Sequence, residues 1–127
     1  KGLKEYTGKR FRACSITDNV AVMTAWANDT AYDNIFAEQL DSLLQPGDVV
    51  LAISGSGNSP NVIKAVEKAN EMGAITIGWS GFEGGKLAKV AQKSLVVNSN
   101  NMQRIEDVHM ILGHLVFASL MKQCGPA

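Results

Sequence analysis

The chain has 127 residues, enough for one domain with a real hydrophobic core. Its 12 basic and 12 acidic residues balance, which argues against a nucleic-acid or membrane-surface partner. No apolar run approaches the roughly 18 residues of a membrane-spanning helix, and we expect no signal peptide. The cysteines Cys14 and Cys124 are too few for a disulfide framework or a metal cluster, so we expect a cytoplasmic protein.

The first part of the chain predicts one strand and one helix, with an undecided piece between them. We expect the strand over residues 12–17 and the helix over 31–44, where apolar residues recur at helical spacing before Pro46 and Gly47. Residues 19–27 fit either a helical turn or a second short extended piece.

The most informative segment lies in the middle of the chain, over residues 48–64. Residues 49–53 are all apolar, as expected for a strand buried on both faces of a parallel sheet. A loop rich in serine and glycine follows over residues 54–59, which we call the serine loop. A helix is then expected from Pro60, a residue suited to the first helical position, with Ser59 as its N-cap.

The composition of the serine loop predicts a binding site for a small anion, with phosphate as the best match. Glycines let the backbone approach a ligand closely, and a helix N-terminus offers unpaired N–H groups with partial positive charge. The residues expected to hold the phosphate are Ser54, Gly55, Ser56, Gly57, Asn58 and Ser59. The competing interpretation is a tight turn with a helix cap, but one cap needs one serine rather than three.

The serine loop differs from the nucleotide-binding motifs. No Lys-Ser or Lys-Thr pair follows its glycines, so the P-loop pattern is absent. Pro60 stands where the dinucleotide fingerprint requires its third glycine. We therefore expect a terminal phosphate as ligand and no redox cofactor.

The rest of the chain continues the alternation of strands and helices. We expect a helix over 60–72, a strand over 74–79, a short helix over 86–91, a strand over 94–97 and a long helix over 103–122. This order predicts a doubly wound α/β fold, a parallel sheet with helices on both faces and ligands at the carboxyl ends of the strands.

The expected last helix is apolar around most of its circumference. It carries ten large apolar residues between Ile105 and Met121. A domain of this size cannot surround such a helix by itself, and an exposed patch of that extent is unusual in monomers. We therefore expect a closed homo-oligomer, a dimer or a tetramer, in which this helix packs against its symmetry mates.

Ionisable side chains interrupt that apolar surface. At about 100° per residue, Glu106 and His114 lie about 80° apart and can border one cleft, whereas His109 points about 140° away from His114. A lone histidine on an apolar helix is more often a satisfied core residue than a functional one. By pattern alone, Glu5 is a solvated acid near a terminus and Asp29 an N-cap for the helix that follows it.

Several segments together resemble the sugar isomerase (SIS) domain family, and within it the phosphoheptose isomerases. They are SGSGNS, PNVIKAVEKANEMGA, GFEGGKLA, RIEDVHMILGH, and Glu5-Tyr6-Thr7-Gly8, which stands against the family's E-L-T-G. The resemblance covers nearly the whole chain and implies a five-stranded, flavodoxin-like sheet in a homotetramer with shared active sites. It also implies that residues 1–127 form a single SIS domain without its N-terminal segment, because the family's Gly-Asn-Gly-Gly-Ser loop has no counterpart.

The resemblance implies an enzyme that interconverts a phosphorylated aldose and ketose through an enediol, acting on sedoheptulose 7-phosphate. The site residues it implies are Ser54, Ser56 and Ser59 for the phosphate, Asp29, Asn28 and Glu106 for the sugar, and Glu5 and His114 for acid–base catalysis. The alternative is a non-catalytic sugar-phosphate-binding protein, of the sensor or replication-initiator-associating type.

Two positions depart from the family pattern and keep that alternative open. Glu106 stands where the family often has glutamine, and Lys1 where its metal-binding members have histidine. No cofactor is required for the implied reaction. Zinc on Glu5, Glu106 and His114 is kept as a minority interpretation, because a histidine with carboxylates suits that ion.

Overall fold

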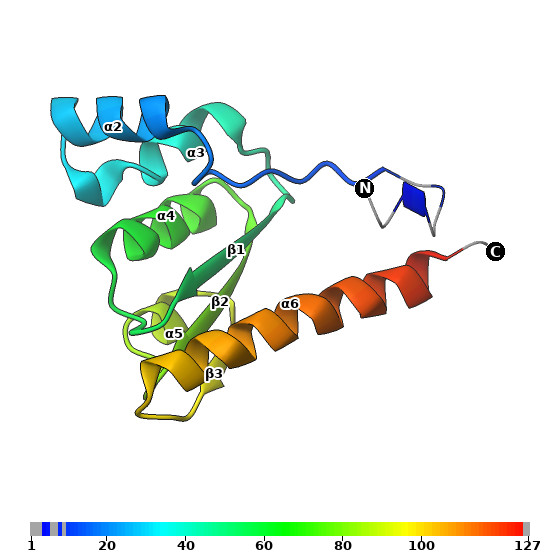
Figure 1. The fold of residues 1–127 in the computed structure, drawn as a ribbon. Helices are drawn as coiled ribbons and strands as arrows, with labels where there is room; N and C mark the ends of the chain where they lie inside the picture. The colour runs from blue at the N-terminus through cyan, green and yellow to red at the C-terminus, as the bar shows by residue number, and fades with distance from the viewer. Residues whose placement is uncertain (1–3, 6–7, 9, 126–127) are drawn as a thin grey trace.

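The computed structural model describes residues 4–5, 8 and 10–125. Its elements, in chain order, are α2 (Val20–Asp29), the 3-10 helix η1 (Tyr32–Asn34), α3 (Ala37–Leu43), β1 (Val49–Ser54), α4 (Pro60–Glu71), β2 (Ile75–Gly81), α5 (Leu87–Val90), β3 (Lys93–Val97) and α6 (Met102–Cys124). Figure 1 shows them as a small sheet with helices on both sides. From β1 onward every expected element is present, which confirms the α/β prediction.

The three strands are parallel and lie in the order β1-β2-β3. Helices α4 and α5 cover one face, where Ala52 packs with Val66 and Leu87. Helix α6 lies on the other face and packs against β2. The described residues therefore form three strands of the five that the family resemblance implies.

The expected strand over residues 12–17 is wrong. Residues 10–15 run without pairing to any described strand. A cavity of about 270 Å³ lies between Ser15, Ile16 and Thr17 on one side and residues 50–53 of β1 on the other. Strand residues need a neighbouring edge for their backbone hydrogen bonds, and the edge of β1 lies across this cavity.

The region before β1 is more helical than the sequence indicated. Helix α2 occupies the undecided piece and includes Asn28 and Asp29, so Asp29 ends one helix and does not cap the next. The single helix expected over 31–44 is divided into η1 and α3. Ile35, between them, is wholly buried, and its carbonyl accepts a hydrogen bond from the Gln39 side chain at 2.7 Å. Burial of Ile35 thus coincides with the break in the helix.

Strand β1 is buried on one face only, which corrects a second expectation. Ala52 and Ser54 are buried, while Val49, Leu51 and Ile53 are 59%, 47% and 49% exposed. The open face is the one on which α6 lies, because α6 crosses the sheet at β2 and leaves β1 uncovered.

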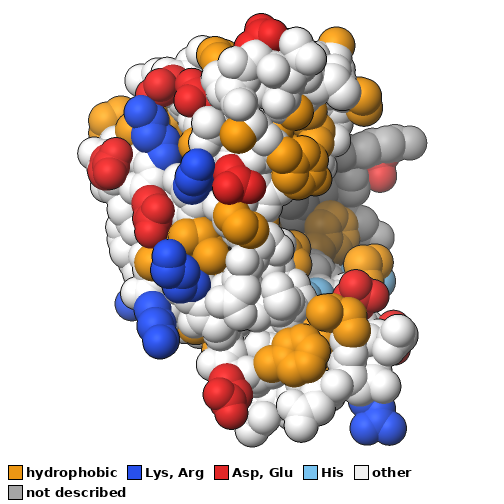
Figure 2. All heavy atoms as spheres, turned by 90° about the vertical axis from the view of Figure 1, so that its left-hand side faces the viewer, with side chains coloured by type: hydrophobic (Ala, Val, Ile, Leu, Met, Phe, Trp, Pro, Cys, Tyr) orange, Lys and Arg blue, Asp and Glu red, His pale blue; other side chains and the backbone are white. Residues whose placement is uncertain are grey.

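Most of α6 is exposed. Only Ile105 and His109 are buried among its residues, and its second half extends past the sheet (Figure 1). Its exposed large apolar side chains are Met110, Ile111, Leu115, Val116 and Phe117. None of the described helices combines the length and apolar character that crossing a membrane requires. Figure 2 shows acidic and basic side chains interspersed on the face turned to the viewer, with no large area of one sign.

Candidate functional site

The serine loop connects the carboxyl end of β1 to the first turn of α4. Ser54, the last residue of β1, is buried, and its Oγ lies 2.9 Å from the Oγ of Ser59. The Ser56 hydroxyl accepts a hydrogen bond of 3.2 Å from the N–H of Asn58. The three hydroxyls expected from the sequence thus belong to one short turn at the carboxyl end of a strand.

The N-terminus of α4 is left open by its own cap residue. Ser59 occupies the N-cap position, as expected, but its hydroxyl makes no capping hydrogen bond and pairs with Ser54 instead. Among the described residues none accepts a hydrogen bond from the N–H of Ser59 or Asn61. These donors, together with the partial positive charge of the helix end, suit an anion. Ser59 thus holds the N-cap position of a tight turn, but its hydroxyl does not cap the helix.

A second loop, residues 81–86, is locked against the serine loop. The Gly57 carbonyl accepts a hydrogen bond of 2.9 Å from Leu87 N–H, and Asn58 Oδ1 accepts one of 3.1 Å from Lys86 N–H. The backbones approach so closely that a Cβ on Gly57 would lie 2.1 Å from the Gly84 carbonyl oxygen. Gly57 also has a φ of +68°, a conformation that favours glycine. The second loop therefore fixes the shape of the first.

The first two turns of α6 pack directly on these loops. A Cβ on Gly55 would lie 2.5 Å from the Met102 Sδ, and one on Gly81 would lie 2.3 Å from Ile105 Cδ1. Gly81 N–H also donates to the Gly55 carbonyl at 2.9 Å. The helix that carries Glu106 and His114 therefore begins against the two loops.

His109 is buried and joins α6 to β2. Its Nε2 lies 3.3 Å from the Ser80 carbonyl oxygen, and its ring centroid is 6.2 Å from that of Trp79. His114, in contrast, is exposed. The two histidines face different surroundings, as the helical spacing predicted.

Ser80 is a polar residue that the sequence analysis missed. It is fully buried, and its Oγ has no hydrogen-bond partner among the residues that the structure describes. Its only signal in the sequence is a serine at the end of an apolar strand, which does not reveal that it pairs in register with Ser54.

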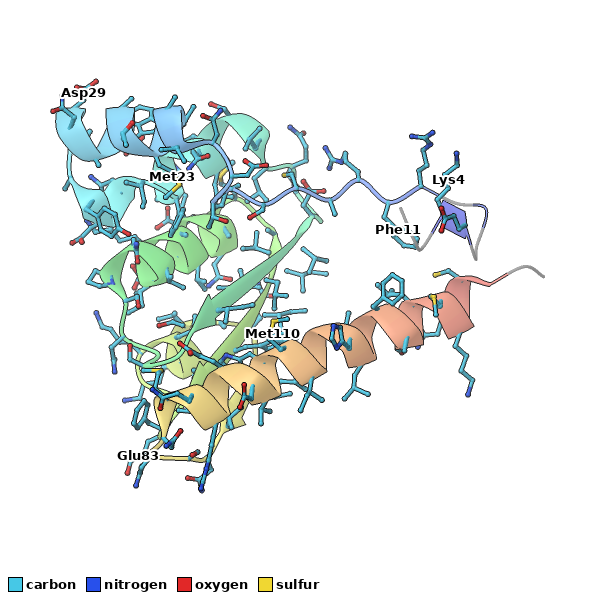
Figure 3. The ribbon with its side chains drawn as sticks, in the orientation of Figure 1. Lys4, Phe11, Met23, Asp29, Glu83 and Met110 are labelled. Atoms are coloured by element: carbon cyan, nitrogen blue, oxygen red, sulfur yellow. The ribbon has the colours of Figure 1, made fainter. Side chains whose placement is uncertain are left out.

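The residues implied for the sugar and for acid–base chemistry are dispersed within one chain. Glu5, Asn28, Asp29, Glu106 and His114 are all exposed. Figure 3 places Asp29 at the far end of α2, and Lys4, the neighbour of Glu5, at the end of the molecule opposite the carboxyl end of β1. Glu106 directly follows the buried Ile105, whose side chain packs on Gly81 of the second loop.

The same residues do not form a metal site within the described part of one chain. Within the described part of the chain, no three His, Cys, Asp or Glu side chains come close enough together to hold a metal. Glu5, Glu106 and His114 have suitable donor atoms but do not converge within one chain, so no step is assigned to zinc.

Comparison with known proteins identifies the family. The sequence model of the SIS domain matches residues 8–81. That match covers more than half of the chain, and the chain belongs to the SIS domain family.

Two curated relatives carry the name phosphoheptose isomerase. The protein of Paramagnetospirillum magneticum is 38% identical over 122 residues, a match that covers 96% of this chain and 64% of the relative. That of Aquifex aeolicus is 41% identical over 104 residues, which cover 82% and 54%. The chain thus spans between about half and two thirds of the length of these relatives.

Two solved structures share the fold. The phosphoheptose isomerase of Neisseria gonorrhoeae superposes with a TM-score of 0.83 at 34% identity, covering 96% of this chain and 66% of that one. The phosphoheptose isomerase of Francisella tularensis gives a TM-score of 0.82 at 28% identity, covering 96% and 69%.

Proposed function

We propose that the protein is a phosphosugar aldose–ketose isomerase that acts on sedoheptulose 7-phosphate. The observation that carries this proposal is the serine loop, where hydroxyls and free N–H groups meet at an uncapped helix N-terminus. The names of the relatives support the choice of a phosphorylated heptose. The two free cysteines fit a cytoplasmic location, which we include in the proposal.

The reaction needs a site that binds the phosphate and two side chains that act as general base and general acid. The serine loop holds the phosphate, and this remote binding energy keeps the reacting carbons in position. A base takes a proton from the carbon next to the carbonyl to give the enediol, and an acid returns a proton to the neighbouring carbon. We assign these roles to Glu5 and His114, with Asn28, Asp29 and Glu106 as sugar contacts.

The dispersion of these residues leads us to propose a homo-oligomer with sites completed by a neighbouring chain. The exposed apolar side chains of α6 and the uncovered residues Val49, Leu51 and Ile53 of β1 supply an apolar surface for such contacts. Leu115 and Val116, next to His114 in α6, are 59% and 46% exposed. Contacts between copies through α6 would then form beside His114.

A turnover assay with sedoheptulose 7-phosphate tests the activity. We expect conversion to the aldose phosphate, and loss of that conversion in His114→Ala with little change in the affinity for the sugar phosphate. A wild-type protein that is stabilised by the sugar phosphate without converting it would be a binding protein instead. Full turnover in His114→Ala would contradict the acid–base assignment.

The assembly is tested separately by light scattering. The double variant Leu115→Glu, Val116→Glu should give monomers or aggregates and lose activity together with assembly. A native mass of one subunit for the unmodified protein would overturn the oligomer and the shared site.

A further inference from the structure

We propose that Ser80 is a positioning residue of the phosphate site, a fourth hydroxyl that acts through Ser54. This inference rests on the proposed function, since it assigns a role in the same phosphate site. Its observations are the burial of Ser80, the unpartnered state of its hydroxyl and its place beside Ser54 in the sheet.

The sheet register places the two serines side by side. Ser54 of β1 and Ser80 of β2 are direct partners in the parallel ladder, where neighbouring strands lie about 4.8 Å apart. Side chains in register on parallel strands point to the same face. On this face Thr76, four residues before Ser80, bonds to Asn70 of α4. The Ser80 hydroxyl therefore lies on the α4 side, with Ser54.

The Ser80 hydroxyl has a close comparator on the same strand. Thr76 is equally buried, but its Oγ1 donates to Asn70 at 2.7 Å and accepts from Gln92 N–H at 3.0 Å. A fully buried hydroxyl without a partner is unfavourable, and native structures keep few of them. The Thr76 hydroxyl thus stabilises the fold through its hydrogen bonds, whereas the Ser80 hydroxyl is available to bond to another group.

The Ser54–Ser59 pair explains how the Ser80 hydroxyl can form a hydrogen bond when phosphate binds. The two hydroxyls lie 2.9 Å apart, so one donates to the other. A phosphate dianion accepts from both hydroxyls, and the lone pairs of Ser54 Oγ are then available to a further donor. A rotation about χ1 lets Ser80 donate to Ser54, which strengthens the bond from Ser54 to the phosphate.

The backbone of Ser80 is held while its side chain rotates. Its carbonyl oxygen lies 3.3 Å from the buried His109 Nε2, and the next residue, Gly81, donates to the Gly55 carbonyl at 2.9 Å. The hydroxyl is thus the movable part of an otherwise fixed position. This is the arrangement expected of a group that acts when the ligand binds.

Two matched substitutions test the inference, each measured by calorimetric titration with sedoheptulose 7-phosphate and with inorganic phosphate, and by thermal unfolding. Ser80→Ala should weaken binding of both ligands by about three- to tenfold, the worth of one hydrogen bond. Its melting temperature should be unchanged or higher, because a buried hydroxyl without a partner is removed. Thr76→Val should do the reverse, with a melting temperature lower by about 4 °C or more and unchanged phosphate affinity.

The outcomes separate this inference from the proposed function. Wild-type affinity in Ser80→Ala overturns the role of Ser80 alone, as does a fall in its melting temperature like that of Thr76→Val. A wild-type protein that binds neither ligand overturns the phosphate site and the role of Ser80 together. Binding without turnover overturns the isomerase activity, and the affinity loss in Ser80→Ala then still supports the role of Ser80.

Discussion

Helices α4 and α6 differ in how much of their surface is buried within one chain. Five of the 12 residues of α4 are buried, compared with two of the 23 residues of α6. Helix α4 packs against β1, α3 and α5, and its first turn forms part of the serine loop. Helix α6 has the same kind of contact only in its first two turns, at Ile105 and His109. The serine loop is thus built within one chain, whereas most of α6, including His114, is exposed in that chain.

The largest expected effect tests the contact between the serine loop and the second loop. Gly57→Val places a side chain against the Gly84 carbonyl and forces a branched residue to a φ of +68°. We expect a loss of about 3 kcal/mol or more in the free energy of unfolding, with loss of phosphate binding. Urea denaturation measures the first and calorimetric titration the second. A stable variant that still binds phosphate would show that the two loops are not locked together.

A smaller effect is expected from Asn58→Ala. This change removes the acceptor of Lys86 N–H and the donor to the Ser56 carbonyl, bonds of 3.1 and 3.0 Å. We expect a loss of about 1 kcal/mol in unfolding free energy and weaker phosphate binding. The exposed Asn98, whose side chain makes no hydrogen bond to the described residues, provides the control Asn98→Ala. Equal effects from the two variants would contradict the bridging role of Asn58.

The substitution Gly113→Ala tests the exposed part of α6. No described atom lies within 4 Å of a Cβ at Gly113, which is in the middle of α6. Replacing glycine by alanine in a helix stabilises it by about 0.5–1 kcal/mol, and we expect that gain in thermal or urea unfolding. A loss would mean that another chain approaches α6 closely at this residue, which would locate the interface.

The smallest effect is a pH dependence at the start of β1. The hydrogen bond from Gln45 N–H, followed by the Arg12 guanidinium, lowers the pKa of Asp48 below its ordinary 3.8. Because the folded pKa is the lower one, the stabilisation is present above the unfolded pKa and is lost as the pH falls through the folded value. The unfolding free energies of wild type and Asp48→Asn should therefore differ near about pH 6 and converge near about pH 2. A constant difference would contradict the assignment.

The sequence predicted well the part of the fold whose elements are determined locally. The strand over β1, the helix from Pro60 and the long last helix all follow from apolar spacing and turn residues, and the structure confirms them. Residues 12–17 were also expected to form a strand but do not, because pairing depends on a neighbouring edge that local sequence does not show. Asp29 fits the sequence pattern of an N-cap for the next helix, yet it is the last residue of α2.

The candidate site divides in the same way. The three serines of the loop could be predicted because the chain itself brings them together over six residues. Ser80 could not, because its position beside Ser54 arises from the sheet register. The acid–base roles of Glu5 and His114 remain predictions, since the described part of one chain does not bring the two side chains together.

The bonds between the two loops also provide a built-in reporter of ligand occupancy. The amides of Lys86 and Leu87 are bonded to Asn58 and Gly57, across two consecutive strand–helix units. Their deuterium uptake requires the loops to separate, whereas the last turn of α6 exchanges by local fraying. A phosphate that bridges Ser54, Ser59 and the α4 N-terminus would oppose that separation. Slower exchange at these two amides would then measure binding without any chemical turnover.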